Sequence, residues 1–505
     1  VLLAGRYPLW WLVPPEQELN YQQYADNLLL HRFVRAGEVI DLGGLDRVSA
    51  EEFFGAALWQ LYKGIDSPYK SILKILLMEA YSRDYPHPQW LAQQAKEAIY
   101  ANETDLDQLD AYILLYQLVE AYLTKIDDPE RLELARRSFY FKVGERLSRN
   151  TEQQHWRREI LFKLTRQWGW GQTQLQMLDT RAEWKIDQVV KERNVLVGVL
   201  SRSYRLLTDF ARKYAKQSHI EPQELNLLGR KLYTALDHRP GKIDQINPGI
   251  SRNLAEPQLS LHYRTSRDGG LAWMLYRGKV DEEQAADHRP IKITSHLIEI
   301  LLWSHINQVW GSDSRISLYP DTCQVRRQEL LDLRHSLKQL YPDQYLASAS
   351  MQALAKPARL MQAALFLNIG TDPLEHQSKE GMQLTSNRHD PLSFASARTN
   401  LALHLEELLY TSWGELLVAR REGEEGLLDA LCNILNLQDQ QASQPADIHA
   451  FSFSSIRGAQ IASRVVELFS CIAEYFQGSS DQPGRYAFRL GSEFFIVQQR
   501  DKGYT

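Results

Sequence analysis

The strongest constraint on the fold of this chain is a helical spacing of apolar residues that persists from about residue 18 to about residue 236. In residues 110–125, for example, Tyr112, Leu115 and Val119 follow one another at steps of three and four residues, which places them on one face of an amphipathic helix. The same spacing predicts helices over residues 131–149, 153–168, 183–216 and 222–236. We therefore expect residues 18–238 to form a helical region.

The pattern changes after about residue 238. Short apolar stretches typical of strands now alternate with helical stretches, which favours a mixed α/β domain over residues 239–505 and an α+β chain as a whole. Strands are expected over residues 259–263, 271–276, 291–294, 315–319, 360–369, 401–405, 448–453, 486–490 and 494–498. Helices are expected over residues 297–309, 326–341, 424–435 and 458–476. Because no closing element follows the last strand, we expect this domain to be incomplete at its C-terminal end.

Composition excludes several classes of protein. The 58 Lys and Arg residues are outnumbered by 63 Asp and Glu residues, and the net charge of -5 argues against a nucleic-acid-binding protein. Three widely spaced cysteines can form neither a disulfide framework nor a CxxC metal motif, and they fit a reducing, cytoplasmic compartment. No apolar run approaches the roughly 18–20 residues of a membrane span.

A helical hairpin over residues 41–81 carries the clearest candidate chemistry. Ser49 and Glu52 form a capping-box pattern that predicts a helix start, and this helix is expected to end at Gly64. Ser67, as N-cap before a proline, predicts the start of a second helix.

Three lysines lie near the start of that second helix. Lys70 and Lys74 share one of its faces, and Lys63 lies just before Ser67. Three ammonium groups beside a helix N-terminus could bind phosphate. The alternative, which is the more common case, is a hairpin whose solvated face happens to hold three lysines.

The hairpin strongly resembles the class I adenylate cyclases of gamma-proteobacteria. Their signature EYFGxxLWxLYK stands here as EFFGAALWQLYK at residues 52–63, with Phe53 replacing a tyrosine. The resemblance spans nearly the whole chain and continues through IDSPYK (65–70), RRSFYFKVGERLSR (136–149), WKIDQV (184–189), PGKIDQINPGIS (240–251) and FSFSSIRG (451–458).

This resemblance implies conversion of ATP to cyclic AMP and pyrophosphate by a nucleotidyltransferase-like palm followed by helices that close the nucleotide pocket. Mg2+ would be held by a Gly-Ser and Asp-x-Asp palm, which the chain lacks and which we expect upstream of Val1. The aromatic segment 8–14, within residues 1–17, would then be the last strand of a truncated palm. The chain is expected to be an inactive fragment of an active enzyme.

The same resemblance implies that four residues of the hairpin hold the triphosphate of ATP: Lys63, Ser67, Lys70 and Lys74. The alternative is that these residues have only a structural role. Asp105-Leu106-Asp107 matches an Asp-x-Asp pattern but lies at a predicted helix start, so we interpret it as a cap and not as a metal ligand.

The domain over residues 239–505 resembles the family's regulatory half, which implies control by the glucose-specific protein of the phosphotransferase system. A second family signature, YRNxWxExRTLHFxG, is only faintly echoed in residues 408–423, and when the two are aligned on Trp413 the histidine of the signature falls on Arg420. That substitution puts any control through the histidine in doubt. A different class also fits: a regulatory module that binds a nucleotide or a partner without catalysis.

Overall fold

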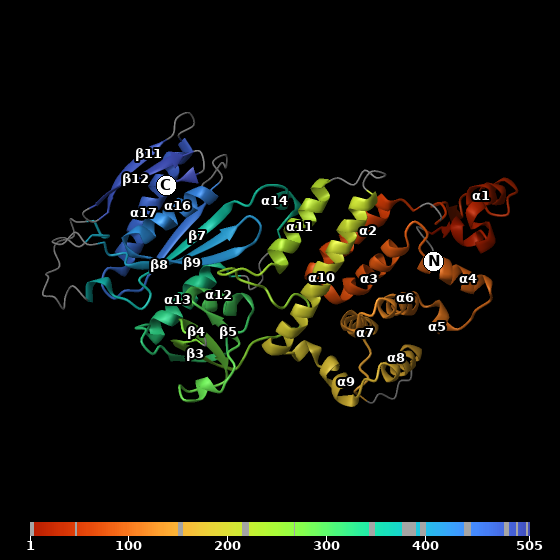
Figure 1. Ribbon diagram of the computed structural model, residues 1–505, viewed down its shortest axis with the longest axis horizontal. Coiled ribbons are helices and arrows are strands. Elements are labelled where there is room, and N and C mark those ends of the chain that lie inside the picture. Colours follow the sequence, from red (N-terminus) through yellow and green to blue (C-terminus); the bar gives the residue numbers. More distant parts are fainter. Residues whose placement is uncertain are drawn as a thin grey trace. The chain divides into compact units, whose positions relative to one another are not determined.

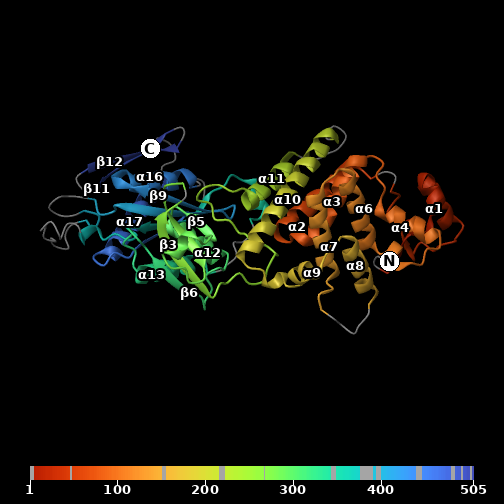
Figure 2. The same cartoon turned by 60° about the horizontal axis from the view of Figure 1, so that its bottom comes forward.

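The computed structural model describes residues 5–45, 48–149, 155–214, 222–266, 268–342, 349–375, 390–393, 400–438, 446–478, 484–490, 493–500 and 503–505. The chain forms two compact units (Figures 1 and 2). Unit 1 comprises Val1–Trp184, Val189–Leu232 and Pro248–Arg252, and unit 2 comprises Lys185–Gln188, Tyr233–Asn247 and Asn253–Thr505.

Residues 1–4 lie outside the described part of the chain, and the first described residues of unit 1 form turns and helices, so the expected strand over residues 8–14 is wrong. Strand β1 is only Tyr7–Pro8, paired in parallel with β2 (Val39–Ile40). Two 3-10 helices follow, η1 (Leu9–Leu12) and η2 (Pro15–Asn20), and then α1 (Tyr21–Leu30). The indole of Trp10 donates to Glu18 at 2.8 Å, a contact that requires the chain to turn back on itself. Within the described residues, the only strand that pairs with β1 is the two-residue β2, and so short a pair stabilises an extended chain very little. Folding back to pack Trp10 against Glu18 is therefore more favourable for this segment than extending as a strand.

The other regular elements in the described part of unit 1 after α1 and β2 are helices, as the spacing predicts. The remaining helices are α2 (Ala50–Asp66), α3 (Pro68–Asp84), α4 (Leu91–Tyr100), α5 (Leu106–Leu109), α6 (Ala111–Lys125), α7 (Pro129–Val143), α8 (Trp156–Gln167), α9 (Gln172–Asp179), η3 (Arg181–Glu183), α10 (Ile186–Tyr214) and α11 (Pro222–Leu236). Helix α3 packs against α2, α6 and α7 and buries Ile72, Leu73, Leu76 and Leu77, the residues expected on its core side (Figure 1).

Unit 2 is built on β-sheets, which confirms a mixed helix and sheet chain. One sheet has the order β5 (Lys292–Thr294), β4 (Leu271–Arg277), β3 (Gln258–Thr265) and β6 (Arg315–Tyr319). A second has the order β10 (Asp447–Ser452), β7 (Leu360–Leu367), β8 (His404–Thr411) and β9 (Leu416–Glu422). The third contains β11 (Arg485–Leu490), β12 (Glu493–Arg500) and β13 (Gly503–Tyr504). Among the described residues of unit 2, the helices are η5 (Gln284–Ala286), α12 (Leu297–Ile306), α13 (Arg327–Leu340), α14 (Met351–Ala355), α16 (Gly423–Leu437) and α17 (Gly458–Gly478).

Strand β8 organises the second sheet by directing alternate side chains to opposite faces. Leu405 and Leu409 join a core with α16 and α17 on one face, where Glu407 accepts from Asn433 of α16. On the other face, Glu406 accepts from the backbone N–H groups of Leu297 and Ile298 at 3.2 and 2.7 Å, and so caps α12. The expected strand at 401–405 is therefore displaced, because β8 begins at His404 and runs through two buried glutamates.

Helix α12 is apolar on all sides, and each of its residues except Glu299 is buried. It contacts β4, β5 and α13 within unit 2. Such a helix belongs in the interior of a domain. Within the parts of the chain that the structure describes, no helix has both the length and the hydropathy that crossing a bilayer requires.

The Glu406 carboxyl should make the stability of unit 2 depend on pH. Burial raises its pKa from 4.5 to about 7, so the unfolded chain loses this proton near pH 4.5 and the folded chain near pH 7. Its contribution to stability is complete below pH 4.5 and is lost as the pH rises to 7. This loss is on the order of 2–3 kcal/mol. We expect Glu406→Gln to remove this share of the pH dependence, so that the urea midpoint falls less steeply between pH 5 and pH 7 than in the unsubstituted chain.

The exposed carboxyl of Glu474 on α17 offers a control. Glu474→Gln should leave the pH dependence of the urea midpoint as it is in the unsubstituted chain. An equally steep pH dependence in Glu406→Gln would contradict the assignment.

Candidate functional site

The start of α2 agrees with the sequence prediction, whereas the junction between α2 and α3 differs from it in detail. The Ser49 hydroxyl accepts from the backbone N–H of Glu52 at 3.2 Å and caps α2. The expected end of α2 at Gly64 is wrong, because the helix continues to Asp66. Ser67 does occupy the N-cap position of α3, with Pro68 next, but its hydroxyl makes no capping hydrogen bond.

Gly64 is buried inside α2 because two other helices approach it closely. A Cβ atom at this position would lie 3.0 Å from Cδ2 of Leu200 in α10 and 3.1 Å from Cδ1 of Ile75 in α3. Real Cβ atoms rarely have contacts this short, so the glycine allows α2 to pack directly on both neighbours. This packing fixes the direction in which the residues around the corner project.

All four residues selected from the sequence line one pocket at this corner, which we call the lysine pocket. Its volume is about 380 Å3. Lys63 comes from α2, Ser67 from the junction, and Lys70 and Lys74 from the exposed side of α3. The complete lining is Gln60, Tyr62, Lys63, Asp66, Ser67, Lys70, Ser71, Lys74 and Lys142. The structure brings the four residues together, while their role in binding phosphate stays a prediction.

The lysine pocket is strongly cationic. Its lining contains four lysines and one aspartate, so its formal charge is 4 − 1 = +3. Lys231 of α11 lies behind this lining, with its Nζ 3.2 Å from the centroid of the Tyr62 ring and 3.5 Å from Oδ2 of Asp66. Since Lys231 offsets the charge of Asp66, the lining aspartate does little to neutralise the four lysines.

A buried polar network holds the first turn of α3 in place. The hydroxyl of Tyr69, next to Lys70, donates to Oε1 of Glu192 in α10 at 2.9 Å, and Arg137 of α7 donates to the same carboxylate. Burial and the Glu192 carboxylate raise the pKa of Tyr69, so its hydroxyl keeps its proton and remains a donor. The guanidinium of Arg181 lies 4.8 Å from the centroid of the Tyr69 ring. Burial lowers the pKa of Arg181.

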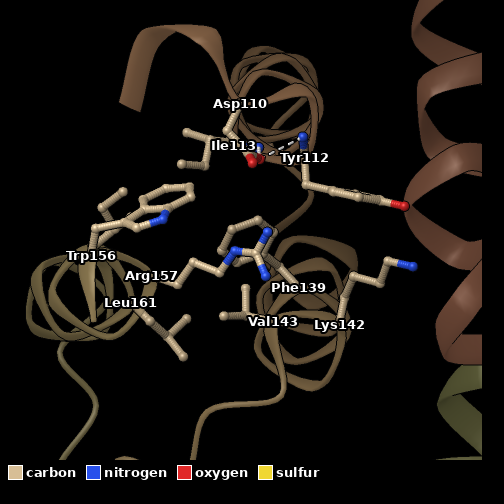
Figure 3. Close-up of a pocket in the computed structure, with 10 residues that line it drawn as sticks. Asp110, Tyr112, Ile113, Phe139, Lys142, Val143, Trp156, Arg157 and Leu161 are labelled. Atoms are coloured by element: carbon tan, nitrogen blue, oxygen red, sulfur yellow. Dashed lines mark hydrogen bonds between the residues drawn. The ribbon is translucent and has the colours of Figure 1, made fainter. Parts of the chain in front are cut away.

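A second and smaller pocket, which we call the aromatic pocket, lies between α6, α7 and α8 (Figure 3). Its volume is about 110 Å3. It is lined by Asp110, Tyr112, Ile113, Phe139, Lys142, Val143, Trp156, Arg157, Ile160 and Leu161. Lys142 therefore lines both pockets, and its Nζ lies 4.6 Å from the centroid of the Tyr112 ring.

The sequence reasoning missed Tyr62, Asp66 and Lys142 as residues of the lysine pocket. On α2, Asp66 lies three residues after Lys63 and four after Tyr62, so helical spacing could have brought first Asp66 and then Tyr62 into the predicted site. Lys142 comes from α7, far away in sequence. The one available signal was its position inside the block at residues 136–149 that resembles the family.

The other candidates have structural roles. Asp105 is the N-cap of α5 and accepts from the backbone N–H of Asp107 at 3.0 Å, which confirms the interpretation as a cap. Arg420 in β9 forms an ion pair with Glu422 at 2.8 Å. The indole of Trp413 donates to the carbonyl groups of Ala353 and Lys356.

The lysine pocket does not fit a divalent metal ion. Its four ammonium groups repel a cation, and Asp66 is its one carboxylate, whereas Mg2+ prefers oxygen ligands with negative charge. Across the described residues, no group of three or more His, Cys, Asp or Glu side chains could hold a metal ion. What this pocket can bind is a polyanion.

Three family models match consecutive parts of the chain. They are described as class-I adenylate cyclase, second domain (residues 48–247), third domain (254–345) and fourth domain (348–504). The region that the sequence analysis treats as one domain after residue 239 is thus matched by two of these models. No solved structure shows significant similarity to the chain.

Curated relatives match over nearly the whole chain. The adenylate cyclase of Yersinia intermedia is 37% identical over 491 residues, which cover 96% of this chain and 57% of that protein. The adenylate cyclase of Escherichia coli K12 is 36% identical over 499 residues, which cover 98% of this chain and 58% of that protein. The adenylate cyclase of Proteus mirabilis is 35% identical, with 98% and 58% coverage. The chain therefore spans somewhat more than half the length of these relatives.

Two glycines of α2 provide a matched test of the corner geometry. Gly64→Ala should destabilise the chain by about 1–3 kcal/mol, because a methyl group must be forced between Leu200 and Ile75. Gly55→Ala, on the same helix with nothing within 4 Å of the new Cβ, should stabilise it by about 0.5–1 kcal/mol. Thermal unfolding of both variants measures the difference. Equal shifts of the two melting temperatures would show that close packing at Gly64 is unimportant.

Proposed function

This chain belongs to the class I adenylate cyclase family, and on that premise we propose that the whole protein converts ATP to cyclic AMP and pyrophosphate. In this proposal the lysine pocket of unit 1 holds the triphosphate. One observation carries it: Lys63, Ser67, Lys70 and Lys74, selected from sequence, all line a single cationic pocket.

The chemistry of the pocket supports a triphosphate ligand. Lysine ammonium groups are common partners of phosphate, and their attraction to several phosphate charges adds up when they converge. The pocket also lies at the start of α3, where the side chain of the N-cap residue does not cap the helix and the helix dipole favours an anion. The Ser67 hydroxyl, which does not cap the helix, can donate to a phosphate oxygen.

These residues would act on the leaving group of the reaction. Cyclisation requires the ribose 3′-oxygen to attack the α-phosphorus in line while the bond to pyrophosphate breaks, so negative charge grows on the leaving phosphates. Lysines already positioned around those phosphates stabilise this charge without having to reorganise. Their second role is to orient the triphosphate so that the attack is in line.

The catalytic carboxylates are proposed to lie elsewhere in the whole protein. The matched domains are the second to the fourth of the family, and the chain covers 57–58% of its relatives. A nucleotidyltransferase-like palm with Gly-Ser and Asp-x-Asp residues would belong to a further domain. A divalent metal bound there would supply activation of the attacking oxygen, and residues of this chain are assigned no part in holding it.

The C-terminal region is proposed to have the regulatory role implied by the family. The third-domain and fourth-domain models cover most of this region. Control by the glucose-specific phosphotransferase protein stays a prediction. Arg420 cannot accept a phosphoryl group as histidine can.

The 505-residue chain by itself should make no cyclic AMP from ATP and Mg2+, because the proposed palm is not part of it. The whole protein should make cyclic AMP under the same conditions. Product is measured by chromatography in both cases. Cyclic AMP production by the chain alone would contradict the proposal that the catalytic carboxylates lie outside it. A whole protein that binds ATP but makes no cyclic AMP would instead favour a regulatory module.

Lys70→Ala should weaken binding of ATP and of inorganic tripolyphosphate to this chain by about 1.5–3 kcal/mol, the range for a hydrogen bond to a charged group. Isothermal titration calorimetry measures both affinities, and the same substitution in the whole protein should lower kcat/KM for ATP. The matched control is Lys125→Ala, at an exposed lysine in the last turn of α6. If both variants bind tripolyphosphate as the unsubstituted chain does, the lysines are a solvated helix face.

A further inference from the structure

The two pockets of unit 1 meet at a shared wall. Lys142 lines both, and Tyr112, which lies under its ammonium group, lines the aromatic pocket. In Figure 3 the Tyr112 hydroxyl and the Lys142 ammonium group point to the same side, away from the centre of the aromatic pocket. A ligand with an anionic end and an aromatic end could therefore occupy both pockets across this wall.

The aromatic pocket suits a flat aromatic ring. Trp156 and Arg157 extend from α8 toward Phe139 and Val143 of α7 (Figure 3), and Ile113 at the start of α6 is buried against the same space. Aromatic side chains and the plane of an arginine guanidinium are the groups on which nucleic-acid bases stack. The apolar side chains favour removal of the ring from water.

We propose that the aromatic pocket holds the purine ring of the nucleotide whose triphosphate occupies the lysine pocket. This inference rests on the proposed function, because that function supplies the phosphates. It adds residues of α6 and α8, and further residues of α7, to a site otherwise built from the α2–α3 corner and Lys142. Lys142 is the residue that contacts the nucleotide from both sides, between the base and the phosphates.

The purine subsite gives ATP an advantage that tripolyphosphate lacks. Stacking of one base is worth enough for about a tenfold or larger gain in affinity. ATP should therefore bind this chain at least about tenfold more tightly than tripolyphosphate. Adenosine, which has no phosphate, should bind weakly in the aromatic pocket.

A substitution that fills the aromatic pocket tests this directly. Ile160→Trp, on the α8 side of the pocket, should reduce ATP affinity to that of tripolyphosphate and abolish adenosine binding. Tripolyphosphate affinity should be unchanged, which also shows that unit 1 remains folded. Lys163→Trp adds the same bulk to an exposed position of α8 and should change none of the three affinities. Calorimetry measures ATP and tripolyphosphate, and saturation-transfer NMR detects adenosine.

If Ile160→Trp fails to fold, Trp156→Leu removes the stacking ring and should reduce the ATP advantage in the same way. The inference is overturned if ATP and tripolyphosphate bind equally tightly, or if the filled pocket keeps the ATP advantage. The proposed function can still stand in that case, provided Lys70→Ala weakens tripolyphosphate binding. Conversely, adenosine binding that Ile160→Trp abolishes and Lys70→Ala leaves intact supports the purine subsite by itself, even if tripolyphosphate does not bind.

Discussion

The candidate site depends on close helix packing at one glycine. At Gly64 the helices α2, α3 and α10 come so close together that an added methyl group would lie 3.0–3.1 Å from Leu200 and Ile75, which would have to shift to make room for it. Because α2 and α3 are consecutive and meet next to this contact, the residues on either side of the junction, Lys63 and Lys70, must project into the same space. The buried bond from Tyr69 to Glu192 then fixes the rotation of the first turn of α3. A packing constraint in the apolar core thus determines how charges are arranged at the surface.

That arrangement is unfavourable unless something binds. Four ammonium groups around one pocket repel one another, and the nearby Asp66 is shared with the buried Lys231. Water and salt reduce the repulsion because the lysines are exposed, so the chain can tolerate it. A polyanion would replace this repulsion by attraction at several points at once. The pocket therefore contributes little to the stability of the protein, and its charge suits the polyanion that we propose as its ligand.

Features that depend on residues close together in sequence could be predicted. Features that depend on contacts between residues far apart in sequence could not. The helix over residues 110–125, the cap at Ser49 and the convergence of Lys63 with Lys70 and Lys74 follow from spacing within a few turns. The α+β class follows from the change of pattern after residue 238. Lys142 could not be placed, because it reaches the pocket from α7 through packing of α3 against α7. Strand β8 was largely missed because Glu406 and Glu407 read as solvent-exposed residues, and only the three-dimensional structure supplies partners that allow them to be buried.

Those two glutamates also connect the folding of unit 2 to the solution around it. Burial raises the pKa of both Glu406 and Glu407 to about 7. At pH 7 each is therefore about half protonated when folded, whereas both are ionised in the unfolded chain, whose pKa values stay near 4.5. Folding of this unit consequently takes up about one proton from the buffer at neutral pH. The heat measured for unfolding will then include the ionisation heat of the buffer, so calorimetry in phosphate and in Tris should give different apparent enthalpies for the same structural change.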